Sequence, residues 1–197
     1  MKKFLIISIS LFLFLVLWNR YMPSWNHPSE EEMRETCQDS GSPVNIIVDF
    51  SKPSCQDRLY IFDASGSGKA KIYYTGPVLH GCGGKSTART PEFSNVIGSN
   101  CSSLGVYELT EISRMRNGLP CIKLRGLSAT NSNAAARHIY IHPCRIVSLL
   151  PFEIYGACFP LTHASEGCFT VSHQGFREIK KLFEQNPKMK LYARNGE

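Results

Sequence analysis

The sequence predicts a mainly β fold with a few helices, of the α+β class, organised as one domain. Short β-branched and aromatic runs, bounded by Gly, Pro, Ser and Asn, recur from Val44 onward and are typical of strands. Only one later segment has helical spacing. A chain of 197 residues with 43% hydrophobic composition can form one core of ordinary size but leaves little room for two.

The expected strands are separated by turns rich in residues that tolerate positive φ, such as the glycines of 65–68 and 81–84 and the Asn117-Gly118 pair. They cover residues 44–50, 58–63, 71–80, 104–109, 121–127 and 137–142. Between residues 173 and 186, apolar side chains recur every three or four positions, and Pro187 ends the run. This predicts one amphipathic C-terminal helix, and the alternation over 189–193 predicts a final strand returning to the sheet.

The N-terminal segment is expected to direct export. Lys2 and Lys3 precede an apolar run from Phe4 to Trp18, after which the sequence turns polar. The run is long for a signal peptide and short for a membrane span, so residues 1–25 are either a cleaved signal peptide or an uncleaved signal-anchor in the inner membrane. Residues 26–43 are polar and are expected to be a linker with one or two helical turns, and residues 44–197 form the predicted domain.

The charge and the cysteines narrow the function classes. The formal net charge of +6 comes without a dense basic run, which argues against a nucleic-acid partner.

Eight cysteines in an exported chain favour disulfide pairs. No Cys-x-x-Cys occurs, so the usual zinc and thioredoxin-like spacings are missing, and we expect no metal and no cofactor. If one cysteine is a working thiol, seven remain, and an odd number cannot all pair within one chain.

Two short segments carry the candidate chemistry. His142 ends a predicted strand, and Cys168 follows Gly167 at the entry to another β-rich run. A nucleophilic thiol needs an imidazole to take its proton and backbone amides directed at the attacked carbonyl, and a glycine allows that close approach. On residue chemistry alone two alternatives stay open, a structural histidine and a cysteine in a disulfide.

Several short segments stand in a characteristic order, at residues 48–54, 58–63, 78–81, 93–95, 98–99, 102–107, 126–127, 131–134 and 137–142. The series ends with Ser165-Glu166-Gly167-Cys168. In this order, the segments resemble the murein L,D-transpeptidase catalytic-domain family over about residues 44–172.

This resemblance implies an L,D-transpeptidase-type β-sandwich or barrel. It also implies that the Cys168 thiol attacks a peptidoglycan stem tetrapeptide after its third residue, with His142 as general base and loss of the terminal D-alanine. The thioester then passes to an amine or to water, so the chain resembles a transpeptidase or a carboxypeptidase. The implied location is the periplasmic side of a bacterial envelope, with stem peptides as partner and no obligate protein partner.

Further roles follow from the same resemblance. The amides around Gly167 and Cys168 are expected to form an oxyanion hole, and Ser165 to support their loop. His80 is expected either to line the cleft or to be a structural turn histidine. Arg137 is expected either to face substrate carboxylates or, as we favour, to pair with an acidic neighbour.

The chain also departs from the family pattern. Glu166 places a carboxylate next to the nucleophile, which would raise the pKa of the thiol unless the side chain points away. A long interval between His142 and Cys168 contains Cys144 and Cys158, which we expect to form a disulfide across the site. The alternative function is a non-catalytic peptidoglycan-binding or envelope-scaffolding domain with Cys168 in a disulfide.

Overall fold

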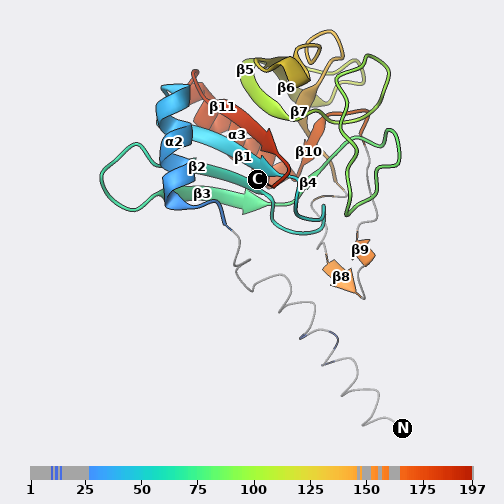
Figure 1. Cartoon of the computed structure of the whole chain (residues 1–197), viewed down its shortest axis with the longest axis horizontal. Coiled ribbons are helices and arrows are strands. Elements are labelled where there is room, and N and C mark those ends of the chain that lie inside the picture. Colours follow the sequence, from blue (N-terminus) through green and yellow to red (C-terminus); the bar gives the residue numbers. More distant parts are fainter. Residues whose placement is uncertain are drawn as a thin grey trace.

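The computed structural model describes residues 27–145 and 165–196, together with Ser10, Phe12, Phe14, Val147, residues 152–154 and residues 157–159. Its helices are α2 (Glu30–Ser40), α3 (His173–Gln185) and the 3-10 helix η1 (Ala129–Asn131) (Figure 1). Its strands are β1 (Val44–Asp49), β2 (Leu59–Asp63), β3 (Lys71–Gly76), β4 (Val78–Leu79), β5 (Gly105–Arg114), β6 (Pro120–Gly126), β7 (Tyr140–Pro143), β8 (Phe152–Ile154), β9 (Ala157–Phe159), β10 (Phe169–Val171) and β11 (Lys190–Arg194).

One nine-stranded sheet dominates the described residues, which confirms the predicted mainly β, α+β class. Its strand order is β3-β2-β1-β11-β5-β6-β7-β10-β4. The two edge strands, β3 and β4, follow each other in the chain with Pro77 between them. Because consecutive residues cannot lie far apart, the sheet must curl until its edges approach, and it forms a nearly closed barrel.

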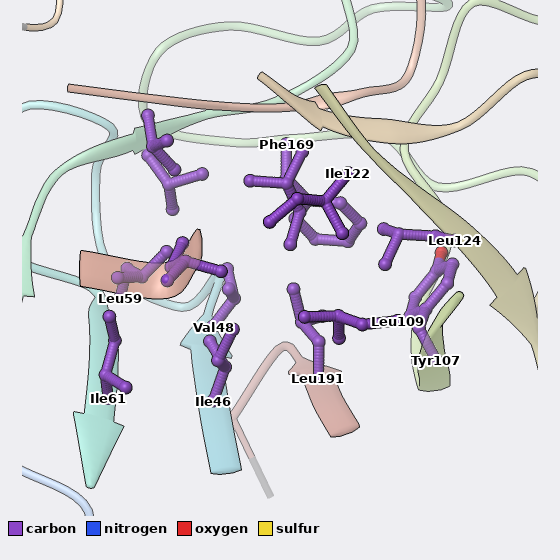
Figure 2. Packing of buried hydrophobic residues seen from close by; sticks show 14 of the residues in the cluster. Ile46, Val48, Leu59, Ile61, Tyr107, Leu109, Ile122, Leu124, Phe169 and Leu191 are labelled. Carbon is purple, nitrogen blue, oxygen red and sulfur yellow. The ribbon is translucent and has the colours of Figure 1, made fainter. Parts of the chain in front are cut away.

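The predicted C-terminal helix is confirmed as α3, which packs against β3 and β7. Ser172 caps its first turn by accepting a hydrogen bond from the Gly175 amide at 2.9 Å. Its buried apolar side chains join the main core, in which Ile46, Val48, Leu59, Ile61 and Phe169 meet (Figure 2). The last strand, β11, pairs parallel with β1 and antiparallel with β5, as a strand returning to the sheet.

Helix α2 occupies most of the segment 26–43 that was expected to be a linker. Ser29 caps it, and Met33 and Cys37 are buried against Ile47 of β1 and Phe62 of β2. Since side chains alternate along β1, this helix covers the face opposite to the main core. Both faces of β1 are therefore buried, which explains why its residues 46–48 are apolar without alternation.

The buried Arg58 ties the start of β2 to the opposite edge of the sheet. Its guanidinium donates to the Val78 carbonyl at 2.6 and 2.9 Å and to the Lys52 carbonyl at 2.8 Å. The side chain is fully buried and stacks over Phe50, with Cζ 4.9 Å from the ring centre. The cation thus joins the chain segments where the barrel closes.

The expected signal segment 1–25 lies outside the described residues, apart from Ser10, Phe12 and Phe14. Within the part of the chain that is described, no helix combines the length and the hydrophobicity needed to cross a bilayer.

Candidate active site

The candidate base and nucleophile lie on one face of the sheet, because His142 belongs to β7 and Cys168 directly precedes β10. They pair in parallel, with Phe169 opposite Ile141 and Thr170 opposite His142. Because side chains alternate, Cys168 and Thr170 share a face with Tyr140 and His142, whereas Ile141 and Phe169 enter the core. The strand parity predicted from the sequence is therefore present, with Ile139 and Ile141 fully buried.

The Cys168 thiol is 7% exposed and is hydrogen-bonded to backbone. Its Sγ accepts from the Tyr140 amide at 3.4 Å and donates to the His138 carbonyl at 3.5 Å. Burial raises the pKa of this thiol to about 11, against a lowering by the Tyr140 amide. The thiol is therefore protonated at neutral pH.

Two charged neighbours act on the Cys168 thiol in opposite directions. The carboxylate of Glu166, which is exposed, contributes to raising the pKa of Cys168, and the guanidinium of Arg137 lowers it. Both effects are smaller than that of burial. Glu166, which departs from the family pattern, thus opposes ionisation of the Cys168 thiol, as expected. Burial of the thiol is nevertheless the main cause of its raised pKa.

The imidazole of His142 is oriented through both nitrogens. Nδ1 lies 3.4 Å from the Pro143 carbonyl, which can only accept, so Nδ1 carries the hydrogen. Nε2 lies 3.2 Å from the Thr170 hydroxyl and is the acceptor of that bond. Burial lowers the pKa of His142, so the ring is neutral with its free electron pair on Nε2.

The loop from Ser165 to Cys168 has a shape that requires glycine. Gly167 has φ +113°, and a Cβ there would lie 2.7 Å from the Cys101 carbonyl oxygen and 2.8 Å from Cδ1 of Ile139. The Ser165 hydroxyl donates to the Cys168 carbonyl at 2.7 Å and accepts from the Gly167 amide at 3.3 Å. Ser165 therefore closes the loop around Cys168, the candidate nucleophile.

His80 lies inside a buried hydrogen-bond network behind this loop. Its Nδ1 accepts from Arg58 at 2.7 Å and its Nε2 donates to the Thr87 carbonyl at 2.9 Å, and no part of the residue is exposed. The next residue, Gly81, forms a β-bridge with Ser165. In this structure His80 supports the segment that holds the nucleophile loop and has no surface for contact with a substrate.

Arg137 is half-buried and its partners are neutral. One terminal nitrogen donates to the Ser94 carbonyl at 2.7 Å, and the other donates to the Cys101 carbonyl and, at 3.3 Å, to the Ser99 hydroxyl. The acidic neighbour that we favoured does not occur among these hydrogen bonds. Arg137 instead anchors the loop of residues 94–103 beneath Gly167, where its charge also lowers the pKa of Cys168.

The expected disulfide between Cys144 and Cys158 stays a prediction, because the Cys158 side chain lies outside the described residues. Cys168 forms no disulfide in the structure. Sequence reasoning missed Thr170 and Tyr140 as site residues. The alternation along the two strands could have found them, because they have the parity of Cys168 and His142.

The sequence also matches a known protein family. A family model described as the L,D-transpeptidase catalytic domain matches residues 27–192, a range that contains every candidate site residue. A search of curated proteins gives no match. With most of its length matched, and with a thiol and an imidazole on one face of two paired strands, the chain belongs to the L,D-transpeptidase catalytic-domain family, whose activity is of the peptidoglycan transpeptidase type.

Proposed function

We propose that the chain is a peptidoglycan L,D-transpeptidase, or an L,D-carboxypeptidase, that works through a thioester at Cys168. The observation that carries this proposal is that Cys168, which directly precedes β10, shares a face with His142 of β7, two register positions away. Family membership supports the substrate class, the stem tetrapeptides of peptidoglycan. It also supports the cell envelope as the place of action, on the periplasmic side.

In the proposed first step, the thiol turns from the His138 carbonyl toward His142, and Nε2 takes its proton. The sulfur attacks the carbonyl carbon of the third stem residue and forms the carbon–sulfur bond. When the tetrahedral intermediate collapses, the bond to the D-alanine nitrogen breaks, and that nitrogen takes the proton from His142. The product is a thioester and free D-alanine.

In the second step, the amine of a neighbouring stem or a water molecule attacks the thioester carbon. His142 takes a proton from the attacking group, the carbon–sulfur bond breaks, and the leaving sulfur regains that proton. Because both the thiol and the imidazole are neutral at rest, the transfer is general-base catalysis coupled to attack and not the use of a preformed ion pair.

The alternative is a binding or scaffolding domain with the same fold. The observation that favours it is the buried, protonated state of Cys168, whose pKa of about 11 leaves little thiolate at neutral pH. The two functions differ in whether a substrate-like carbonyl acylates Cys168, so acylation separates them.

A test uses a carbapenem, which presents a strained lactam carbonyl to the thiol. Intact mass and peptide mapping of the folded, non-reduced protein should show one adduct at Cys168. The variant Cys168→Ala should show none there, and Cys82→Ala, which removes an exposed thiol, should react like the wild type. A folded wild-type protein with no adduct at Cys168 would favour the binding domain.

A further inference from the structure

Ser102 is a fully buried serine whose hydroxyl joins two of the segments around the nucleophile. Its Oγ accepts from the Gly81 amide at 2.9 Å and donates to the Gly167 carbonyl at 3.1 Å. An amide nitrogen can only donate and a carbonyl can only accept, so the single hydroxyl proton must point at Gly167. The residue is 0% exposed, so the hydroxyl has no contact with bulk solvent.

The backbone around Ser102 is fixed as well. Ser102 forms a β-bridge with Phe93, and its carbonyl accepts from the Ser94 amide at 3.0 Å. A Cβ on Gly81 would lie 2.2 Å from the Asn100 carbonyl oxygen, so the two segments are in close backbone contact. The backbone that carries the Ser102 hydroxyl is therefore held in a fixed position.

The Gly167 carbonyl belongs to the peptide unit that contains the Cys168 amide. In a trans peptide the C=O and N–H groups point in opposite directions. A hydrogen bond that holds the Gly167 oxygen toward Ser102 therefore directs the Cys168 N–H away from Ser102. The Gly167 amide already donates to Ser165, which leaves the Cys168 amide as the donor that we assign to the oxyanion.

We propose that Ser102 is a positioning residue for the oxyanion hole, which acts by fixing the orientation of the Gly167–Cys168 peptide unit. This inference rests on the proposed function. Gly167, with its φ of +113°, lacks the Cβ that would otherwise restrict rotation of this peptide unit. The Ser102 hydroxyl supplies the restraint, so that no rotation is needed when negative charge develops on the substrate oxygen.

The test compares two reactions of the same thiol. Alkylation by iodoacetamide forms no oxyanion, whereas acylation by a carbapenem does. In Ser102→Ala we expect acylation of Cys168 to slow by about tenfold or more, with alkylation within about twofold of the wild type. Ser102→Thr keeps the hydroxyl and should recover most of the acylation rate.

Ser42→Ala is the matched control, because Ser42 is a buried serine that also donates to a backbone carbonyl, that of Val44 at 3.0 Å, but lies beside α2. Both of its rates should equal those of the wild type. Acylation by Ser102→Ala within twofold of the wild type would overturn the proposal. An equal loss of alkylation and acylation, or a threonine variant as slow as the alanine variant, would overturn it too.

A measurement without substrate separates this inference from the proposed function. Accepting a hydrogen bond moves a carbonyl ¹³C resonance downfield, so the Gly167 carbonyl should shift upfield in Ser102→Ala and stay in place in Ser42→Ala. An unchanged Gly167 resonance would contradict the Ser102 restraint. A shifted resonance in a protein whose wild type is never acylated would instead count against the proposed function.

Discussion

At the scale of single residues, the site contains a neutral thiol and a neutral imidazole. Desolvation produces both states, because burial penalises the charged form of each side chain. The Cys168 proton is held by the His138 carbonyl, and the Nε2 electron pair of His142 faces the Thr170 hydroxyl. A substrate that displaces these weak contacts would bring the two reacting groups together.

The raised pKa of Cys168 predicts how the rate of its alkylation depends on pH. Because the thiol is protonated below a pKa of about 11, the iodoacetamide rate should rise about tenfold per pH unit from pH 7 and level off near pH 11. Glu166→Gln removes a charge that raises this pKa, so alkylation at pH 8 should become faster, by about two- to threefold at low salt. A rate that levels off at pH 8, or a slower Glu166→Gln variant, would show that the thiol is already ionised.

Thr170 is expected to hold the His142 ring in its orientation, while the Pro143 carbonyl fixes the tautomer. Thr170→Val has nearly the same shape but lacks the hydroxyl that donates to Nε2. We expect the Nε2 resonance of His142 to shift in its imidazole ¹⁵N spectrum and acylation to slow by about tenfold, while Thr170→Ser keeps both properties. An unchanged spectrum in the valine variant would contradict this role.

Only some of the site residues and their contacts could be predicted from the sequence. Cys168, His142, Gly167 and Ser165 stand in a motif whose order the sequence displays. The partners of Arg137 are carbonyls and hydroxyls from the distant loop of residues 94–103, and no local pattern specifies them. Burial of His80 likewise depends on Arg58, which directly precedes β2 and is 22 positions away in the chain.

At the scale of elements, helix α3 supports the site by covering the core behind β7. Its cap, Ser172, immediately follows β10 and also shares a hydrogen bond with the Tyr74 hydroxyl at 2.8 Å. The helix start is thereby linked to β3 as well as to β10, the strand that directly follows Cys168.

Ser172→Ala should lower the free energy of unfolding by about 1–2 kcal/mol, because it removes the helix cap and leaves Tyr74 without this bond. Urea denaturation measures the change. Lys181→Ala on the exposed side of α3 is the control and should change stability by less than about 0.5 kcal/mol. Equal stabilities for the two variants would show that the cap contributes nothing.

The positions of most helices and strands were predicted from hydrophobic periodicity and turn residues. The differences between the predicted and the observed elements have local causes. The strand expected over residues 71–80 is divided at Pro77, which lacks the N–H for a ladder hydrogen bond. The length of helix α2 was underestimated because most of its residues are polar and its buried face, which includes Met33 and Cys37, is small. Only the covered face of β1, far along the chain, reveals why that helix packs.

At the scale of the whole molecule, closure of the sheet brings the segments before and after β4 against the nucleophile loop. Arg58 is central to this closure, since its donors satisfy the Val78 and Lys52 carbonyls and Nδ1 of His80. The sequence predicted the fold class and the positions of most strands of the sheet. It could not predict that β4 pairs with β10, a contact between residues almost a hundred positions apart.

Arg58→Met should be strongly destabilising, by about 3 kcal/mol or more, because it leaves several buried acceptors without donors. Thermal unfolding measures this loss. The exposed Arg125, which pairs with Glu108 at the surface, is the control, and Arg125→Met should have a much smaller effect. Similar losses in both variants would show that barrel closure does not depend on the buried cation.

In the proposed reaction, the imidazole of His142 and the thiol of Cys168 act together on a stem peptide. Release of D-alanine from a disaccharide tetrapeptide tests this most directly, in the wild type, Cys168→Ala and His142→Gln. We expect release by the wild type, and a loss of about a thousandfold or more in each variant with the native fold retained. Undiminished release by folded Cys168→Ala would contradict the account.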